Sequence, residues 1–203
     1  MNKKHAWGTL NIKRAWGTLY TFTGKVSYPK GAPSLFDIAV SLSRECRYAG
    51  AGMRWWPVTL HCFVVSDLLP NHLKIHGLMH DASECVTGDL PKPVKTEAIE
   101  EFEARLMRSI YAHTIRIPEP TPKERVILKD ADTRTLCGEV YTVGTRRLQD
   151  EFPRSPEAED LIMKYLAEYP PLECIEPSGR APIEFMRRFR VYLDLYVAAR
   201  RLR

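Results

Sequence analysis

The chain has 203 residues, 44% of them hydrophobic, which is long enough for one well-filled core. Its net charge of +5 fits an anionic partner, either a nucleotide or a nucleic acid. Five scattered cysteines form no CxxC pair, which is typical of thiols in a reducing compartment. Since no apolar run resembles a signal peptide or a transmembrane span, we expect a cytoplasmic protein without a membrane partner.

Residues 1–34 are expected to form an irregular or lightly stranded N-terminal arm. The segment 19–23 has strand-like composition, and glycines and prolines punctuate the loop after it. Residues 35–203 show helical patterning throughout. We therefore predict an all-α fold, with one helical-bundle domain over residues 35–203.

Local signals place the helices. Ser34 is a plausible N-cap with Asp37 in the first turn, and Pro57 suits the start of the next helix. A Pro-rich linker around residues 118–122 separates the first helices from the later ones. Beyond the helix that begins at Ser34, we expect helices over about 57–68, 71–86, 96–114, 123–148, 156–168 and 182–203.

Titratable side chains are concentrated in the segment 76–84, which contains the motif HDASE at 80–84. On a helix, Glu84 would share a face with Asp81 and His80, which lie three and four residues before it. Imidazole and carboxylate directed at one point make half of a metal site, and a carboxylate one turn away suits proton transfer. Alone, such a cluster is more often a solvated ion pair.

Other segments offer the missing half. His61 and an aspartate near residue 130, either Asp130 or Asp132, lie on separate predicted helices. Helical bundles commonly build metal sites from facing side chains. The mixture of imidazole and carboxylate suits one divalent ion, namely Mn, Co, Fe, Ni or Zn. His76 shares a face with His80 and is an alternative extra ligand for a two-metal site.

Several phrases occur in an order that resembles the HD-domain phosphohydrolases. The resemblance is closest to the branch with bacterial 5′-deoxynucleotidases and phage HD hydrolases. These phrases are DIA at 37–39, LSRECRYAG at 42–50, PVTLH at 57–61, HDASE at 80–84, GDLPKPVK at 88–95 and KDAD at 129–132. The resemblance implies an HD-type helical bundle with a catalytic metal.

The resemblance also assigns residues. It implies that the metal ligands are His61, His80, Asp81 and Asp132. Asp132 is preferred over Asp130 because it directly precedes Thr-Arg. Catalysis would depend on Glu84, with Asp81 contributing as a ligand. One departure is that relatives usually carry Glu before the first histidine, where this chain has Leu60, which leaves the orientation of His61 to another partner.

Basic and aromatic residues near these phrases are candidates for substrate binding: Arg44, Arg47, Lys92, Lys95 and Trp55. The resemblance favours Arg47 and Lys95 as phosphate contacts, and a salt bridge to a carboxylate is the alternative for each. Trp55 is a candidate to stack on a base, and core packing is its alternative.

The expected activity is hydrolysis of deoxynucleotides. The leading hypothesis is a dNTP triphosphohydrolase that releases deoxynucleoside and triphosphate, as some phage relatives do with dATP. Alternatives are a 5′-deoxynucleotidase acting on dNMPs and a non-catalytic, metal-containing helical protein that binds nucleic acid. An additional Mg²⁺ on the substrate phosphates is left open. Relatives imply a homo-oligomer, no stable nucleic-acid partner is expected, and the location would be the host cytoplasm if a phage encodes the chain.

Overall fold

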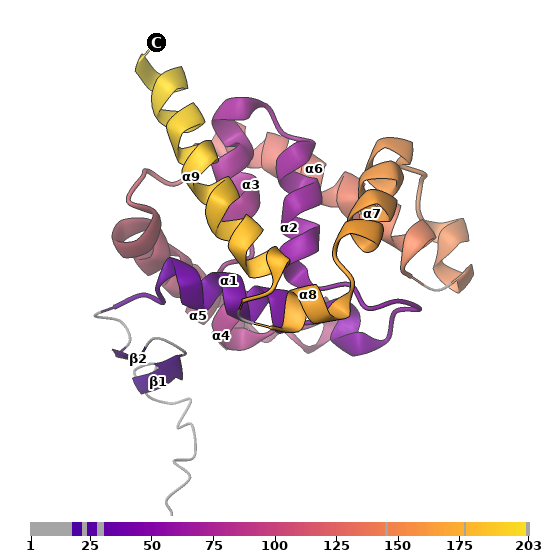
Figure 1. The fold of residues 1–203 in the computed structure, drawn as a ribbon, viewed down its shortest axis with the longest axis horizontal. Coiled ribbons are helices and arrows are strands. Elements are labelled where there is room, and N and C mark those ends of the chain that lie inside the picture. Colours follow the sequence, from indigo (N-terminus) through magenta and orange to yellow (C-terminus); the bar gives the residue numbers. More distant parts are fainter. Residues whose placement is uncertain (1–17, 22–23, 28–30, 145, 177, 202–203) are drawn as a thin grey trace, which may run out of the picture.

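The computed structural model describes residues 18–21, 24–27, 31–144, 146–176 and 178–201 (Figure 1). The described chain is predominantly helical, and the all-α prediction is confirmed. Within these segments, no helix combines the length and the apolar character needed to cross a membrane. The helices are α1 (Leu35–Arg44), α2 (Val58–Asp67), α3 (Lys74–Met79), α4 (Glu84–Thr87), α5 (Glu97–Ile110), α6 (Pro122–Thr142), α7 (Pro156–Glu168), α8 (Pro171–Ile175) and α9 (Arg180–Arg201).

Shorter turns connect several of these helices. They are 3₁₀ turns η1 (Arg47–Gly50), η2 (Asn71–Leu73), η3 (Lys92–Val94) and η5 (Arg146–Glu151), and the π-helical turn η4 (Tyr111–Ile115). Before α1, β1 (Thr18–Thr21) and β2 (Gly24–Ser27) pair as an antiparallel hairpin, with Thr18 opposite Ser27. The arm is thus lightly stranded at 18–21 and 24–27, and residues 1–17, 22–23 and 28–30 lie outside the described residues. The division at residue 34 stays a prediction.

Predicted caps explain where some helices begin. Ser34 accepts a hydrogen bond from the backbone N–H of Asp37, whose carboxylate accepts one from the Ser34 backbone, so α1 begins with a capping box. Pro57 is the N-cap of α2. The start and end of α7 are those predicted from the sequence. In contrast, α6 ends at Thr142 instead of near residue 148, and the short α8 was not predicted.

Helix α2 lies at the centre of the bundle (Figure 1). It packs against α1, α3, α6, α7 and α9. All nine residues from Val58 to Ser66 are buried, so α2 lacks the single apolar stripe expected from the sequence. A helix buried on every side excludes water around any polar side chain that it carries. His61, which is fully buried, is such a side chain.

The segment 71–86 is not one continuous helix, contrary to the prediction. α3 ends at Met79, and the chain turns through residues 80–83 before α4 begins at Glu84. The Gly77 carbonyl accepts a hydrogen bond from His80 Nδ1 at 2.8 Å. The backbone bonds that follow join residues three apart instead of four, as from Glu84 N–H to the Asp81 carbonyl. A side chain that binds a backbone group of its own turn competes with the helical hydrogen bonds. Residues 80–83 of the motif therefore lie in a turn, and Glu84 is the first residue of α4.

Candidate metal centre

The side chain of His61 projects from the buried helix α2 with both ring nitrogens engaged. Its Nδ1 lies 2.7 Å from Oε1 of Glu139, which is fully buried on α6. An ionised carboxylate only accepts hydrogen bonds, so Nδ1 carries the proton and donates. This contact leaves the lone pair of Nε2 directed toward His80.

His80 presents its ring from the turn after α3. Since Nδ1 donates to the Gly77 carbonyl, its Nε2 is also the free ring nitrogen, and it lies 3.3 Å from His61 Nε2. The two ring centroids are 5.2 Å apart and the rings are tilted by 43°. Two acceptor nitrogens therefore face one point.

Carboxylates approach the same point from two directions. Asp81 Oδ2 lies 3.1 Å from His80 Nε2 and 3.6 Å from His61 Nε2. From α6, Asp132 Oδ1 lies 3.2 Å from His61 Nε2 and 3.8 Å from His80 Nε2. The structure thus brings together the four predicted ligands, and it brings Asp132 rather than Asp130, which is exposed beside Arg125 and Lys129.

The chemistry of this donor set fits a divalent cation. Ligand atoms of His61, His80 and Asp81 lie within 4.8 Å of one another, and Asp132 adds a fourth. The His61 side chain is fully buried and the His80 side chain is 11% exposed, whereas the Asp81 and Asp132 side chains are 21% and 23% exposed. A ligand would therefore reach the cluster from the side of the carboxylates. Two imidazoles and two carboxylates suit the borderline metals named above.

Electrostatics around the cluster keep its carboxylates ionised. Burial alone would raise the pKa of Asp81 and of Asp132, but the facing imidazoles outweigh burial and lower both pKa values. Conversely, burial alone would lower the pKa of His80, yet Asp81 and Asp132 raise it well above its usual value. The two carboxylates thus favour the protonated form of His80, and a divalent cation would balance the same negative charge.

Glu139 is the functional residue that the sequence analysis missed. Its Oε1 accepts hydrogen bonds from His61 Nδ1 and from Trp56 Nε1, the latter at 2.6 Å. Its Oε2 accepts hydrogen bonds from the Tyr48 hydroxyl and from Arg47 Nε, the latter at 3.1 Å. A signal was available, because Glu139 follows Asp132 by seven residues, which is two helical turns along the same face of α6.

Glu84 lies at the start of α4 with only 8% exposure. Burial, together with the negative charges of Asp81 and Asp89, raises its pKa to about 9, so the carboxyl is protonated at neutral pH. Oε1 lies 3.7 Å from Lys95 Nζ, and buried Oε2 has no hydrogen-bond partner among the described residues. A buried carboxyl beside a charged cluster is a candidate acid–base group.

Cations contact the acidic residues of this site. Arg47 Nη1 lies 3.7 Å from Asp81 Oδ2, and Lys95 Nζ lies 3.0 Å from Glu103 as well as near Glu84. Both predicted phosphate contacts thus form salt bridges in the ligand-free protein. A third cation, Lys129, belongs to the KDAD motif and was not predicted to bind substrate. Its Nζ lies 2.6 Å from Asp132 Oδ2.

The other candidates from the sequence lie differently. Arg44 is exposed and its Nε donates to the Ile175 carbonyl of α8, while Lys92 is exposed on η3. Trp55 is half-buried, and its indole N–H has no partner in the described part of the chain. His76 Nδ1 lies 3.0 Å from the Tyr111 hydroxyl, so this ring takes part in packing next to η4 instead of joining the four ligands.

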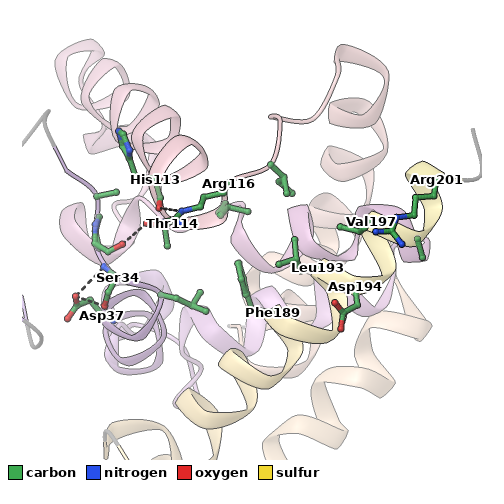
Figure 2. Close-up of a pocket in the computed structure, with 16 residues that line it drawn as sticks. Ser34, Asp37, His113, Thr114, Arg116, Phe189, Leu193, Asp194, Val197 and Arg201 are labelled. Carbon is green, nitrogen blue, oxygen red and sulfur yellow. Dashed lines mark hydrogen bonds between the residues drawn. The ribbon is translucent and has the colours of Figure 1, made fainter.

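A surface cavity of about 980 Å³ lies elsewhere (Figure 2). It lies where the segment before α1, the η4 turn and helix α9 meet, with Ser34, Arg116 and Phe189 on its walls. Thr114 Oγ1 donates to the Pro33 carbonyl beside it at 2.7 Å. None of the ten candidate site residues lines this cavity.

Comparisons with known proteins give limited information. No family model matches the sequence. The uncharacterised protein YfdR of Escherichia coli K12 is 40% identical over 79 residues, which are 37% of this chain. The match covers 44% of YfdR, so this chain spans less than half of that relative's length. The comparisons therefore assign neither a family nor an activity.

Proposed function

We propose that this protein is a metal-dependent phosphohydrolase that acts on deoxynucleotides, with dNTPs as substrates and deoxynucleoside and triphosphate as products. The observation that carries the proposal is the convergence of His61, His80, Asp81 and Asp132 beside a buried, protonatable Glu84. The motif order that resembles HD-domain phosphohydrolases supports the same activity. A structural metal clamp would have no use for Glu84.

Each group has a role in this reaction. A divalent ion held by the four ligands would supply Lewis-acid activation of a phosphate oxygen and of water. Water attacks the α-phosphorus, and the bond from this phosphorus to the 5′-oxygen breaks. Glu84 donates the proton of its buried carboxyl to the leaving 5′-oxygen, and the proton that the water loses restores Glu84. Arg47, Lys95 and Lys129 exchange their carboxylate partners for non-bridging phosphate oxygens, which compensates the negative charge of the substrate.

The choice of a triphosphate rests on the number of these cations. Three separate basic side chains contact Asp81, Glu84 and Asp132, one cation to each acidic residue. A triphosphate carries more negative charge than a monophosphate, so three cations beside a divalent metal match the charge of a triphosphate better. Hydrolysis of dNMPs by a 5′-deoxynucleotidase is the competing activity.

Product analysis tests the proposal directly. The protein is loaded in turn with Mn²⁺, Co²⁺, Zn²⁺, Ni²⁺ and Fe²⁺, with and without added Mg²⁺. Each form is incubated with every dNMP, dNTP and rNTP, and products are separated by ion-exchange chromatography. Release of triphosphate and deoxynucleoside from dNTPs, including dATP, is the expected result. Orthophosphate from dNMPs alone would support the deoxynucleotidase, and no turnover of any nucleotide would refute the proposed activity.

A further inference from the structure

Within the described part of the chain, the Glu139 carboxylate accepts four hydrogen bonds and donates none. They come from an imidazole N–H, an indole N–H, a phenol hydroxyl and a guanidinium N–H, two to each oxygen. A carboxylate offers about four acceptor sites and, when ionised, no donor. Hydrogen bonds at these acceptor sites therefore offset the free-energy cost of burying the Glu139 carboxylate, which is fully buried. Among amino-acid side chains of this size, only a carboxylate accepts hydrogen bonds through both of its terminal atoms.

The two oxygens of Glu139 serve different parts of the site. Oε1 contacts His61, whose opposite nitrogen faces His80, Asp81 and Asp132. Oε2 contacts Arg47, which also reaches Asp81 at 3.7 Å. Glu139 of α6 thus contacts both the candidate metal ligand His61 of α2 and the cation Arg47 of η1.

We propose that Glu139 is a positioning residue: it holds the proton of His61 on Nδ1 so that Nε2 is presented to the metal, and it holds Arg47 beside Asp81 for the substrate. This inference rests on the proposed metal centre. It also explains how the chain tolerates Leu60, because the carboxylate that orients the first histidine comes from α6. A carboxylate bound to the outer nitrogen of a ligand histidine fixes its tautomer and increases its basicity.

The test is metal affinity, measured separately from activity. In Glu139→Gln, one end of the amide becomes a donor that faces other donors, so one pair of contacts is lost. We expect Glu139→Gln to bind Co²⁺ or Zn²⁺ roughly 10–100-fold more weakly than the wild type in equilibrium dialysis. The visible spectrum of its Co²⁺ form should also change. If the amide nitrogen instead faces Arg47 and Tyr48, the KM for substrate should rise because Arg47 is released.

Matched variants separate positioning from stability. Trp56→Phe removes one donor to Oε1 but keeps the contact between Glu139 and His61, so it should lower the melting temperature and leave metal affinity within about threefold of the wild type. Glu159→Gln changes a buried carboxylate of α7 that pairs with Arg154, and it should leave metal affinity and the Co²⁺ spectrum unchanged. If Glu139→Gln binds metal as tightly as the wild type and also keeps the wild-type KM, the inference is wrong.

A measurement on the wild type covers the case in which Glu139→Gln does not fold. In the Zn²⁺-loaded protein, long-range ¹H–¹⁵N NMR should show His61 protonated at Nδ1 and metal-bound at Nε2. The reverse assignment would overturn the inference. Failure of the wild type to bind any divalent ion would instead refute the metal centre itself.

Discussion

The Nε2 atoms of His61 and His80 lie 3.3 Å apart, although unrelated contacts orient the two rings. A carboxylate from α6 fixes His61, whereas a backbone carbonyl within its own turn fixes His80. In both cases Nδ1 is the donor, so the two Nε2 atoms are directed at each other, and their close approach requires a cation or a proton between them. This arrangement is the reason to expect a bound metal.

Removal of a ligand should abolish metal binding. Substitution of a residue that is hydrogen-bonded to a metal ligand typically lowers metal affinity roughly 10–100-fold. We expect Asp132→Asn and His61→Ala, which change the ligands themselves, to lower the affinity for Co²⁺ or Zn²⁺ by more than this. At an ion concentration 100 times the Kd, binding stabilises the wild type by about 2.7 kcal/mol, or roughly 5–10 °C in melting temperature. Calorimetry with and without a chelator measures this shift.

Asp130→Asn is the matched control, because Asp130 lies on the same helix but is exposed and outside the cluster. It should keep the metal-dependent shift in melting temperature. If Asp130→Asn lost the shift and Asp132→Asn kept it, the choice between the two aspartates would be wrong.

Glu84 should be required for turnover but not for metal binding. Glu84→Gln preserves the shape of the side chain and removes its acid–base function. We therefore expect full metal content by elemental analysis and a kcat lower by roughly 10²–10⁴-fold. A variant that hydrolyses dNTPs at the wild-type rate would exclude proton transfer by Glu84. Absence of metal-dependent hydrolysis from the wild type itself would instead favour the non-catalytic, nucleic-acid-binding alternative.

Local patterns are enough to predict part of the site, whereas the choice of His61 and Asp132 depends on the order of the phrases that resembles HD-domain phosphohydrolases. His80, Asp81 and Glu84 lie within five residues, and the start of α1 at Ser34 depends on a capping box four residues long. Hydrophobic periodicity and prolines similarly set the bounds of α7.

Features that depend on packing could not be predicted in the same way. The break after Met79 coincides with a hydrogen bond from His80 Nδ1 to the Gly77 carbonyl, which helical periodicity does not reveal. The role of Glu139 depends on how α6 packs against α2, since its partners come from residues 47–61. Spacing from Asp132 places it on the correct face but does not identify these partners.

Lys95 and Lys129 should affect substrate binding more than chemistry. Each contacts a carboxylate of the site, and we expect Lys95→Gln or Lys129→Gln to raise the KM for a dNTP by about tenfold, equivalent to about 1.4 kcal/mol. Steady-state kinetics at several salt concentrations would measure this effect and its screening. Lys92→Gln changes an exposed lysine of η3 and is expected to leave KM unchanged. Equal effects of all three variants would indicate non-specific steering of the substrate.

His76 should make the fold sensitive to acid. Burial, with smaller effects of Arg200 and His72, lowers its pKa from 6.5 to about 4. The unfolded chain therefore binds a proton near pH 6.5 that the folded chain does not bind until about pH 4, so stability falls as the pH drops between these values. The loss should be at most about 3 kcal/mol. Urea unfolding of His76→Phe across pH 4–8 should show a weaker dependence between pH 6.5 and 4, and an unchanged slope there would contradict the prediction.

Gly77 should be essential for the close packing of α3 against α2. A Cβ at this position would lie 2.5 Å from Leu69 Cδ1 and 3.1 Å from Ser66 Cα, and the latter atom belongs to the backbone of α2. We expect Gly77→Ala to lower the free energy of unfolding by about 1–3 kcal/mol, despite the better helix propensity of alanine. Because the Gly77 carbonyl also orients His80, the displaced backbone should weaken metal binding in the folded variant. Urea unfolding and equilibrium dialysis measure the two effects. Adding Leu69→Ala to this variant removes only the side-chain clash, so a double variant with wild-type metal affinity would show that the Ser66 backbone does not limit the packing.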